Sequence, residues 1–310
     1  MVQTTKNDMF FNKTFLEAYT SEVMAKNYIT ARYLDKKEIN APTVVNYKDE
    51  TKVDGKILDE TRKKARPVTE GTELTEIRAN LLVGDTKSLD LYGFKLEVTD
   101  EMLADEAFIL EKEIRDMSFT LSHLVEQNIV LQLMEQASAP KPKKADIHGN
   151  WANLNDVDEI ADDIIEMQSA FDENDWNFEL NGLFLNKKQV NSIRKGLDYK
   201  VSHYDVNQVK GYPTSTSLSF ADCIHTKSKF MQDGHAIGFD LNAPPATIYY
   251  NGKPNTSTPK VYNGLEDFAP LIRAYIKKDE GVVDKTTFEM AVSFGLVVNK
   301  PGALLHMDGL

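Results

Sequence analysis

The sequence predicts an α+β protein, and three segments carry that prediction. Residues 89–98 and 287–298 each repeat bulky apolar side chains with period two, which is typical of strands with one buried face. Residues 99–137 contain neither Gly nor Pro and place apolar residues at helical spacing. Thr99, followed by two acidic residues, is a typical N-terminal cap, so the long helix directly follows the first strand.

The predicted long helix has two possible packing modes. Its apolar stripe alternates spacings of four and three, as in a coiled-coil seam: Leu103, Ala107, Leu110, Ile114, Met117, Leu121 and Leu124. However, the flanking positions are not consistently charged, and Asn128 interrupts the register. We therefore expect a helix that lies across a sheet, with a possible break near Asp105.

A smaller α/β unit is predicted in the middle of the chain. Residues 156–179 hold ten acidic and no basic residues, and the apolar stripe of a short helix runs through Val157, Ile160, Ile164 and Met167. The acids are expected on its solvated face. A strand ending at Leu185 and a helix over 187–197, capped by Asn186, follow. A further short strand is expected over 246–250, before an Asn-Gly turn.

Composition excludes several classes of protein. The chain has 310 residues and a formal net charge of −12, which disfavours gripping nucleic acid. Its longest apolar run, 107–110, is far shorter than the roughly 20 residues of a membrane span, and no apolar secretory segment follows the first residues. Cys223 is the only cysteine, so an intracellular or disulfide-independent protein is expected.

Motifs for catalysis or metal binding are almost absent. No phosphate-binding glycine loop, His-Glu-x-x-His or Gly-x-Ser-x-Gly pattern occurs. The run from Asp156 to Asp162 begins like a calcium loop but has Met167 where a bidentate Glu belongs. Cys223 lies near His225 and His235, so a thiol nucleophile is one reading and a small buried cysteine the favoured one.

The first third of the chain is rich in charge and short of apolar surface. Residues 1–41 contain aromatic helical pieces that we expect to dock onto something instead of forming a core. The charged stretch before the strand at 89–98 suggests a projecting hairpin arm. Its basic cluster, Arg62, Lys63, Lys64 and Arg66, lies among acids, which favours a salt-bridge surface between subunits over a nucleic-acid contact.

The order of these parts resembles the major capsid proteins of tailed phages and their archaeal relatives, the Hong Kong 97 fold. The most specific passage runs from Arg66-Pro-Val-Thr-Glu-Gly through the strand 89–98 to Thr99-Asp-Glu-Met-Leu-Ala-Asp105. Asp162-Asp163-Ile-Ile-Glu166, the strand ending in Leu183-Phe-Leu-Asn186 and the closing strand before Asn299-Lys-Pro-Gly-Ala303 are also similar.

The resemblance implies four parts. They are an N-terminal arm (1–41), an extended β-hairpin loop (42–98), a peripheral domain with a long spine helix (99–150 and 271–310) and an axial domain (151–270). The arm and the loop, having little apolar surface to bury on their own chain, would contact neighbouring subunits.

The resemblance also implies a function. Subunits would form pentamers and hexamers that close an icosahedral viral shell around double-stranded DNA, without sequence-specific DNA binding and without a membrane. The virion capsid would be assembled in the host cytoplasm. Because Met1 begins at the arm, any scaffolding is expected from a separate protein, and a portal is a further expected partner.

No catalytic, cofactor-binding or metal-ligating residue is expected, and no enzyme activity. Some family members cross-link a loop lysine to an asparagine, but no local motif pairs Lys56, Lys63 or Lys64 with Asn299. Two alternatives remain open at this point. One is an encapsulin-like nanocompartment that encloses a cargo enzyme, and the other is a thiol hydrolase or binding protein that uses Cys223.

Overall fold

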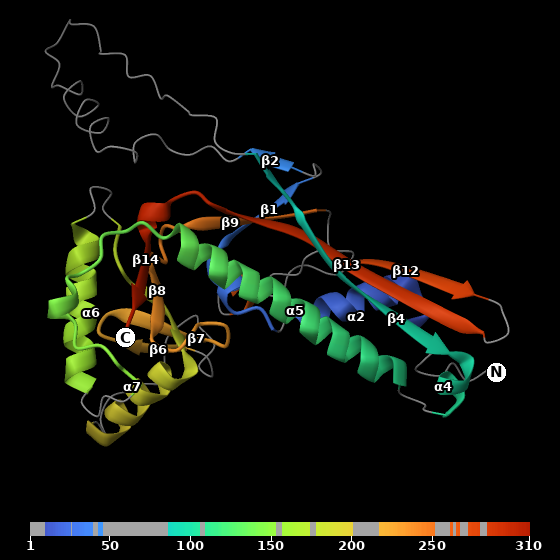
Figure 1. Ribbon diagram of the computed structural model, residues 1–310, viewed down its shortest axis with the longest axis horizontal. Helices are drawn as coiled ribbons and strands as arrows, with labels where there is room; N and C mark the ends of the chain where they lie inside the picture. Colours follow the sequence, from blue (N-terminus) through green and yellow to red (C-terminus); the bar gives the residue numbers. More distant parts are fainter. Residues whose placement is uncertain are drawn as a thin grey trace, which may run out of the picture.

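The structure is a computed structural model that describes residues 10–25, 27–39, 43–45, 86–105, 109–152, 157–173, 178–200, 217–251, 261–262, 265–266, 272–279 and 284–310. This part of the chain contains two five-stranded sheets and two two-stranded ribbons (Figure 1). The ribbons are β2 (Thr43–Val45) with β3 (Thr86–Ser88), and β10 (Val261–Tyr262) with β11 (Leu265–Glu266). Most of the extended loop predicted over 42–98, including the basic cluster at 62–66, lies outside the described residues.

The long sheet is built around strand β13. Its strands are β1 (Asp35–Ile39), β4 (Asp90–Thr99), β9 (Ala246–Asn251), β12 (Ile272–Asp279) and β13 (Lys285–Val298). The first part of β13 pairs antiparallel with β4 on one side and β12 on the other, and its last five residues pair with β9. The period-two patterns at 89–98 and 287–298 are thereby confirmed as strands, and they are direct neighbours in the sheet.

Helices cover one face of the long sheet, its inner face. They are α2 (Lys13–Ala25), α4 (Asp100–Asp105), which follows β4, and α5 (Ile109–Gln136). The Thr99 hydroxyl accepts a hydrogen bond from the Met102 amide at 3.3 Å, so the predicted cap is present. The helical segment is interrupted where expected, since α4 ends at Asp105 and α5 begins at Ile109.

Helix α5 lies along the long sheet, as Figure 1 shows, which confirms the sheet-covering mode over the coiled coil. The predicted apolar stripe is buried at Leu110, Ile114 and Leu121, but it is wrong at Leu124, which is 48 % exposed while Val125 is buried. A straight helix repeats every 3.6 residues, so its buried face drifts away from a 3.5-residue seam. Glu126 on this face is buried and accepts hydrogen bonds from the amides of Ile29 and Thr30.

The N-terminal segment docks onto the long sheet of its own chain. Leu16, Met24 and Tyr28 are fully buried. The Thr20 hydroxyl lies 3.0 Å from the Met290 sulfur, and a carboxylate oxygen of Glu17 accepts a hydrogen bond from the Ala274 amide at 3.1 Å. The predicted docking is confirmed, but the expectation that this arm has little apolar surface to bury on its own chain is wrong for residues 10–34.

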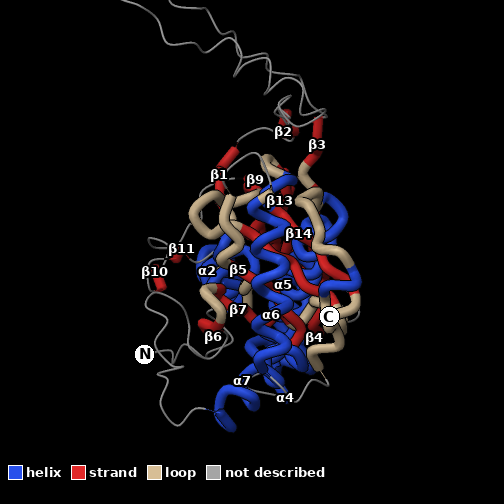
Figure 2. The backbone as a smooth tube through the Cα atoms, turned by 90° about the vertical axis from the view of Figure 1, so that its left-hand side faces the viewer, coloured by secondary structure: helices blue, strands red, loops and turns tan. Residues whose placement is uncertain are grey.

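The short sheet lies at the other end of the molecule, in the order β14-β8-β5-β7-β6 (Figure 1). Its strands are β5 (Gly182–Asn186), β6 (Ser217–Phe220), β7 (Cys223–Ser228), β8 (His235–Phe239) and β14 (Leu304–Asp308). Helices α6 (Val157–Asp172) and α7 (Lys187–Lys200) pack against it, and Figure 2 shows α6 in front of this layer. The apolar stripe predicted for α6 is confirmed as buried.

The closing segment adds a strand that sequence patterns did not indicate. Pro301 starts a short 3-10 turn, η4 (Pro301–Ala303), and β14 then pairs with β8. Strand pairing thus crosses every predicted domain bound. β1 from the predicted arm, β4 from the predicted loop and β9 from the predicted axial domain all lie in the long sheet, and β14 lies in the short one. The domain bounds themselves stay a prediction. Among the described residues, no helix combines the length and the apolarity that a membrane span requires.

Candidate functional site

The thiol of Cys223 is not set up as a nucleophile. It is buried and donates a hydrogen bond to the Leu180 carbonyl at 3.1 Å. Burial raises its pKa to about 12, although the hydrogen bond from Gln168 acts in the opposite direction. A thiol with that pKa is protonated near neutral pH and is a poor nucleophile.

The two histidines near Cys223 in sequence have other partners. The His225 ring is buried, with Nε2 2.9 Å from the Phe220 carbonyl oxygen. His235 instead stacks on His306, and their ring nitrogens Nδ1 and Nε2 lie 3.0 Å apart. In the described ranges, no group of three or more His, Cys, Asp or Glu side chains could hold a metal ion.

His225 makes stability depend on pH. Burial lowers its pKa to about 4, from 6.5. A histidine with a depressed folded-state pKa stabilises the fold above its unfolded pKa, and this contribution is lost as pH falls from 6.5 toward 4. We expect the wild type to lose about 2.5 kcal/mol more unfolding free energy between pH 7.5 and 4.5 than His225→Gln. Urea titrations at both pH values measure this, and equal losses in the two proteins would contradict it.

The acidic helix α6 contains one buried carboxylate, against expectation. Asp163 was expected with the other acids on the solvated face, but it is fully buried. It accepts hydrogen bonds from the backbone amides of His148 and Gly149, at 2.7 and 3.1 Å, and from Trp151 Nε1 at 2.6 Å. Its position, three residues after Ile160, places it on the apolar stripe of α6, so helical spacing was the sequence feature that indicated its burial.

This buried carboxylate anchors the turn at 148–151 to α6. Asn150 and Gly149 have positive φ values of 52° and 69°, so this turn has a left-handed backbone. His148 Nδ1 lies 2.9 Å from Asp163, and this hydrogen bond is the main reason why the pKa of His148 is raised. The turn is therefore held in one geometry, and α6 is positioned by it.

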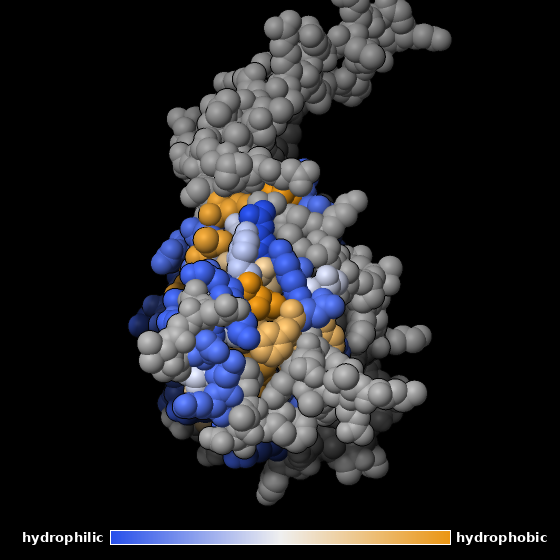
Figure 3. All heavy atoms as spheres, turned by 90° about the vertical axis from the view of Figure 1, so that its right-hand side faces the viewer, coloured by the Kyte–Doolittle hydropathy of each residue, from blue (hydrophilic) through white to orange (hydrophobic). Residues whose placement is uncertain are grey.

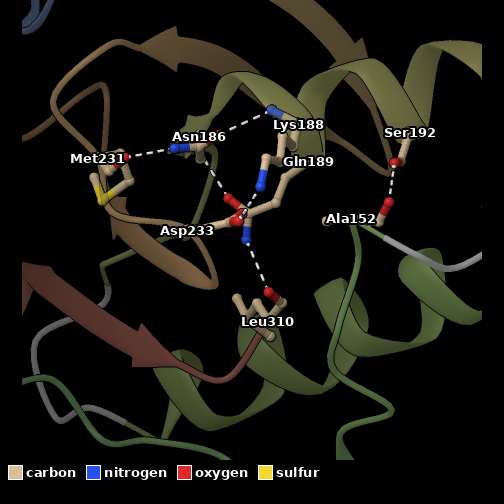
Figure 4. Close-up of polar contacts among 8 residues, drawn as sticks. All are labelled: Ala152, Asn186, Lys188, Gln189, Ser192, Met231, Asp233 and Leu310. Atoms are coloured by element: carbon tan, nitrogen blue, oxygen red, sulfur yellow. Dashed lines mark hydrogen bonds and ion pairs between the residues drawn. The ribbon is translucent and has the colours of Figure 1, made fainter.

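The start of α7 is tied to the last residues of the chain (Figure 4). The side-chain oxygen of Asn186 accepts a hydrogen bond from the Lys188 amide at 3.0 Å, which confirms the predicted cap. Gln189 Nε2 donates to the Leu310 carbonyl at 3.2 Å, and Lys188 pairs with Asp233 at 2.5 Å. An open hollow of about 680 Å³ lies here, lined by polar groups that largely bond one another.

The exposed face of α6 is an acidic stripe. We use this name for Asp158, Asp162, Glu166, Asp172 and Glu173, which all face solvent. Ile165 lies among them and is 52 % exposed. The described part of α6 carries no basic residue. The stripe is thus a negative surface with an apolar centre.

A basic patch lies on the neighbouring elements. It comprises Lys187 and Arg194 on α7, Lys227 on β7 and Lys229 just after β7. The pKa of Lys227 is lowered, first by partial burial and then by the charges of Arg194, Lys187 and Lys229. These cations are therefore close enough to repel one another.

The outer face of the long sheet is mixed. Leu91 on β4 is 72 % exposed and Tyr275 on β12 is 59 % exposed. Charged side chains of the sheet pair with one another: Glu97 contacts Lys95 at 2.7 Å and Lys285 at 3.2 Å. Figure 3 shows apolar surface between hydrophilic side chains at the end of the molecule that carries α4.

Of the residues considered for a lysine–asparagine cross-link, only Asn299 lies in the described part of the chain. Its side-chain amide donates a hydrogen bond to the Thr247 hydroxyl at 2.6 Å. The three lysines considered as partners, Lys56, Lys63 and Lys64, lie outside the described residues.

Known proteins resemble this chain in structure only. No protein-family model and no curated protein sequence matches it. The virus-like particle protein of Pyrococcus furiosus matches with a TM-score of 0.55 at 12 % identity, over 99 % of this chain and 100 % of that one. The capsid protein of cyanophage P-SCSP1u matches with a TM-score of 0.56 at 10 % identity, over 91 % and 88 %.

A third solved structure, the SrpI encapsulin complex of Synechococcus elongatus PCC 7942, matches with a TM-score of 0.51 at 9 % identity, over 91 % of this chain and 88 % of that one. The chain therefore has the Hong Kong 97-like fold of capsid and encapsulin shells, as its order of elements predicted. At these identities, the likeness establishes the fold and not the activity.

Proposed function

We propose that this chain is the major capsid protein of a tailed phage or a related virus. Its copies form pentamers and hexamers that close an icosahedral shell around double-stranded DNA. The observation that carries this proposal is the extent of the structural likeness, which covers 99 % of the chain against a virus-like particle protein. A shell subunit needs no catalytic centre, and we propose that the chain is not an enzyme.

The surface chemistry supports a role in self-assembly. The acidic stripe and the basic patch have opposite charge, and charge complementarity selects partners and register. Leu91 and Tyr275 offer apolar contact area on a different face. The net charge of −12 suits a container that encloses DNA without binding it tightly. A separate scaffolding protein and a portal are the further partners that we propose.

An encapsulin-like compartment is the second candidate, because the SrpI encapsulin has a similar fold. The two functions differ in what the shell contains. Nuclease-protected DNA inside purified particles supports the capsid, and a co-purifying protein in place of DNA supports the compartment.

Assembly is the first test of the proposal. We expect the purified chain, alone or with its scaffold, to sediment as rings or closed particles far faster than a 35.0 kDa monomer. Sedimentation velocity and negative-stain electron microscopy measure this. Cys223→Ala is the control and should assemble like the wild type, since the thiol is buried and paired. A monomer at every protein and salt concentration, with scaffold present, would contradict the proposal.

A further inference from the structure

We infer that the acidic stripe of one copy binds the basic patch of the next copy, in a head-to-tail contact within the ring. The inference rests on the proposed function, since it names the contact that holds neighbouring subunits together. The partner is a second copy of this chain.

Among the residues that the structure describes, the basic patch has no anionic partner, although Lys229 lies over the Phe119 ring, 5.5 Å from its centroid. In the described ranges, Lys187, Arg194, Lys227 and Lys229 form no salt bridge with a carboxylate. Strand pairing places Lys227 opposite Leu185, two residues before α7 begins at Lys187. The pKa of Lys227 is lowered first by partial burial and then by the charges of Arg194, Lys187 and Lys229. Four cations grouped in this way repel one another. A negative surface that binds to them relieves this repulsion, so its electrostatic attraction to the patch is stronger than to an isolated lysine.

Three acids of the acidic stripe likewise form no salt bridge among the described residues. Asp162, Glu166 and Asp172 are exposed and form no salt bridge with a described basic side chain. Ile165 stands among them with half of its surface exposed. An apolar residue surrounded by charge is the usual arrangement of a small contact surface, in which burial adds affinity and the rim sets specificity.

Within one copy, no salt bridge joins Asp162, Glu166 or Asp172 of the stripe to the described residues of the basic patch. Helices α6 and α7 pack through their inner sides, where a Cβ on Gly196 would come within 2.8 Å of Val157 Cβ. Lys187 on α7 and Asp162 and Glu166 on α6 are exposed. In Figure 2, α6 faces the viewer, whereas β7 and β6 lie to its left.

A contact between two different surfaces of identical copies is heterologous, and such contacts produce rings when the rotation closes. The short-sheet layer carries both surfaces, so each copy can bind one neighbour through its stripe and another through its patch. This is the connectivity that a pentamer or a hexamer requires.

Nucleic acid is the competing occupant of the basic patch, but the charges disfavour it. The chain has a net charge of −12, and the acidic stripe belongs to the same layer as the patch. A polyanion approaching the patch also meets that negative field. The same negative stripe is what a neighbouring patch attracts.

Charge reversal tests the contact. The patch variant carries Lys187→Glu and Lys229→Glu, and the stripe variant carries Asp162→Lys and Glu166→Lys; all four side chains are exposed, so the fold should persist. We expect each variant alone to yield at least tenfold less assembled protein than the wild type at 0.1 M salt. A protein carrying all four reversals should assemble again, because both surfaces have changed sign. Lys112→Glu, on the exposed side of α5, is the control and should assemble normally.

Mixing the two variants gives a sharper result. Each reversed surface then finds its complement only on the other variant, so the copies must alternate around the ring. An equimolar mixture should form six-membered rings and no five-membered rings, as counted by native mass spectrometry. Far-ultraviolet circular dichroism confirms that each variant is folded.

The outcomes separate this contact from the proposed function. If the wild type never assembles, the proposed function and the contact both fail. If the wild type and both variants assemble alike, the contact is wrong and the shell function stands. If the patch variant assembles normally but loses binding to a double-stranded DNA oligonucleotide, measured by fluorescence anisotropy, the patch is a DNA contact and the inference is overturned.

Discussion

Asp163→Ala is expected to lower the free energy of unfolding by about 3–5 kcal/mol. The carboxylate is fully buried and accepts hydrogen bonds from the amides of His148 and Gly149 and from the indole of Trp151, in addition to its contact with His148 Nδ1. Without it, the buried Gly149 amide and Trp151 indole lose their acceptor, and each unpaired buried group costs roughly 1–3 kcal/mol. Urea unfolding followed by tryptophan fluorescence measures the loss, because Trp151 reports directly on this site.

The neighbouring acid is the matched control. Asp162 lies in the same helical turn but faces solvent, so Asp162→Ala should change the free energy of unfolding by about 0.5 kcal/mol or less. Equal effects of the two substitutions would contradict the account of how α6 is positioned. The raised pKa of His148 gives a second readout. Its stabilisation is present below the unfolded pKa and lost as pH rises through the folded one, and Asp163→Ala should abolish that dependence.

Phe184→Ala is expected to cost about 3–5 kcal/mol, through the cavity that it leaves. The Phe184 ring stacks on Phe239 with centroids 4.4 Å apart and meets the Tyr33 ring edge-on at 5.4 Å. Tyr33 belongs to the N-terminal segment, whereas both phenylalanines belong to the short sheet. This aromatic group therefore joins the two, and the Tyr33 hydroxyl adds a hydrogen bond to Thr226 at 2.8 Å.

A second phenylalanine provides the comparison. Phe119 on α5 is 38 % exposed, so Phe119→Ala should cost about 1 kcal/mol or less. Urea titration of both variants below the concentration of assembly measures the difference. If Phe184→Ala is no more destabilising than Phe119→Ala, the N-terminal segment does not dock on the short sheet as described.

Simple periodicity was enough to predict the main strands of the fold. A period of two at 89–98 and 287–298 requires a strand with one buried face, and these strands are paired in the long sheet. The caps at Thr99 and Asn186 were also readable, because a side-chain oxygen at these positions satisfies an unpaired amide of the first turn.

The wrong predictions have a common cause, since they depend on tertiary contacts. Leu124 fits a seam by spacing, but the sheet beneath α5 selects the drifting 3.6-residue face, which contains Ser118 and Val125. Asp163 was placed by its charge, although the turn at 148–151 supplies enough donors to bury it. Strand β14 is short and follows a proline, so only its pairing with β8 defines it.

The candidate site was predictable only in part. The acidity of α6 is plain from residues 156–179, where ten acids occur without a base. The basic patch cannot be recognised from the sequence. Lys187 and Arg194 lie on α7, whereas Lys227 and Lys229 are more than thirty residues further along the chain. They meet because β5 and β7 pair in parallel, which places Lys227 opposite Leu185, two residues before α7 begins.

Electron cryo-microscopy of particles assembled from the purified chain, with scaffold if it is required, shows whether this chain forms a closed shell. We expect closed shells with five-fold axes, whose density is filled by this fold, with α6 of each copy against α7 and β7 of its neighbour. Monomers, or a discrete small oligomer that never closes, would contradict the claim that this chain is a shell subunit.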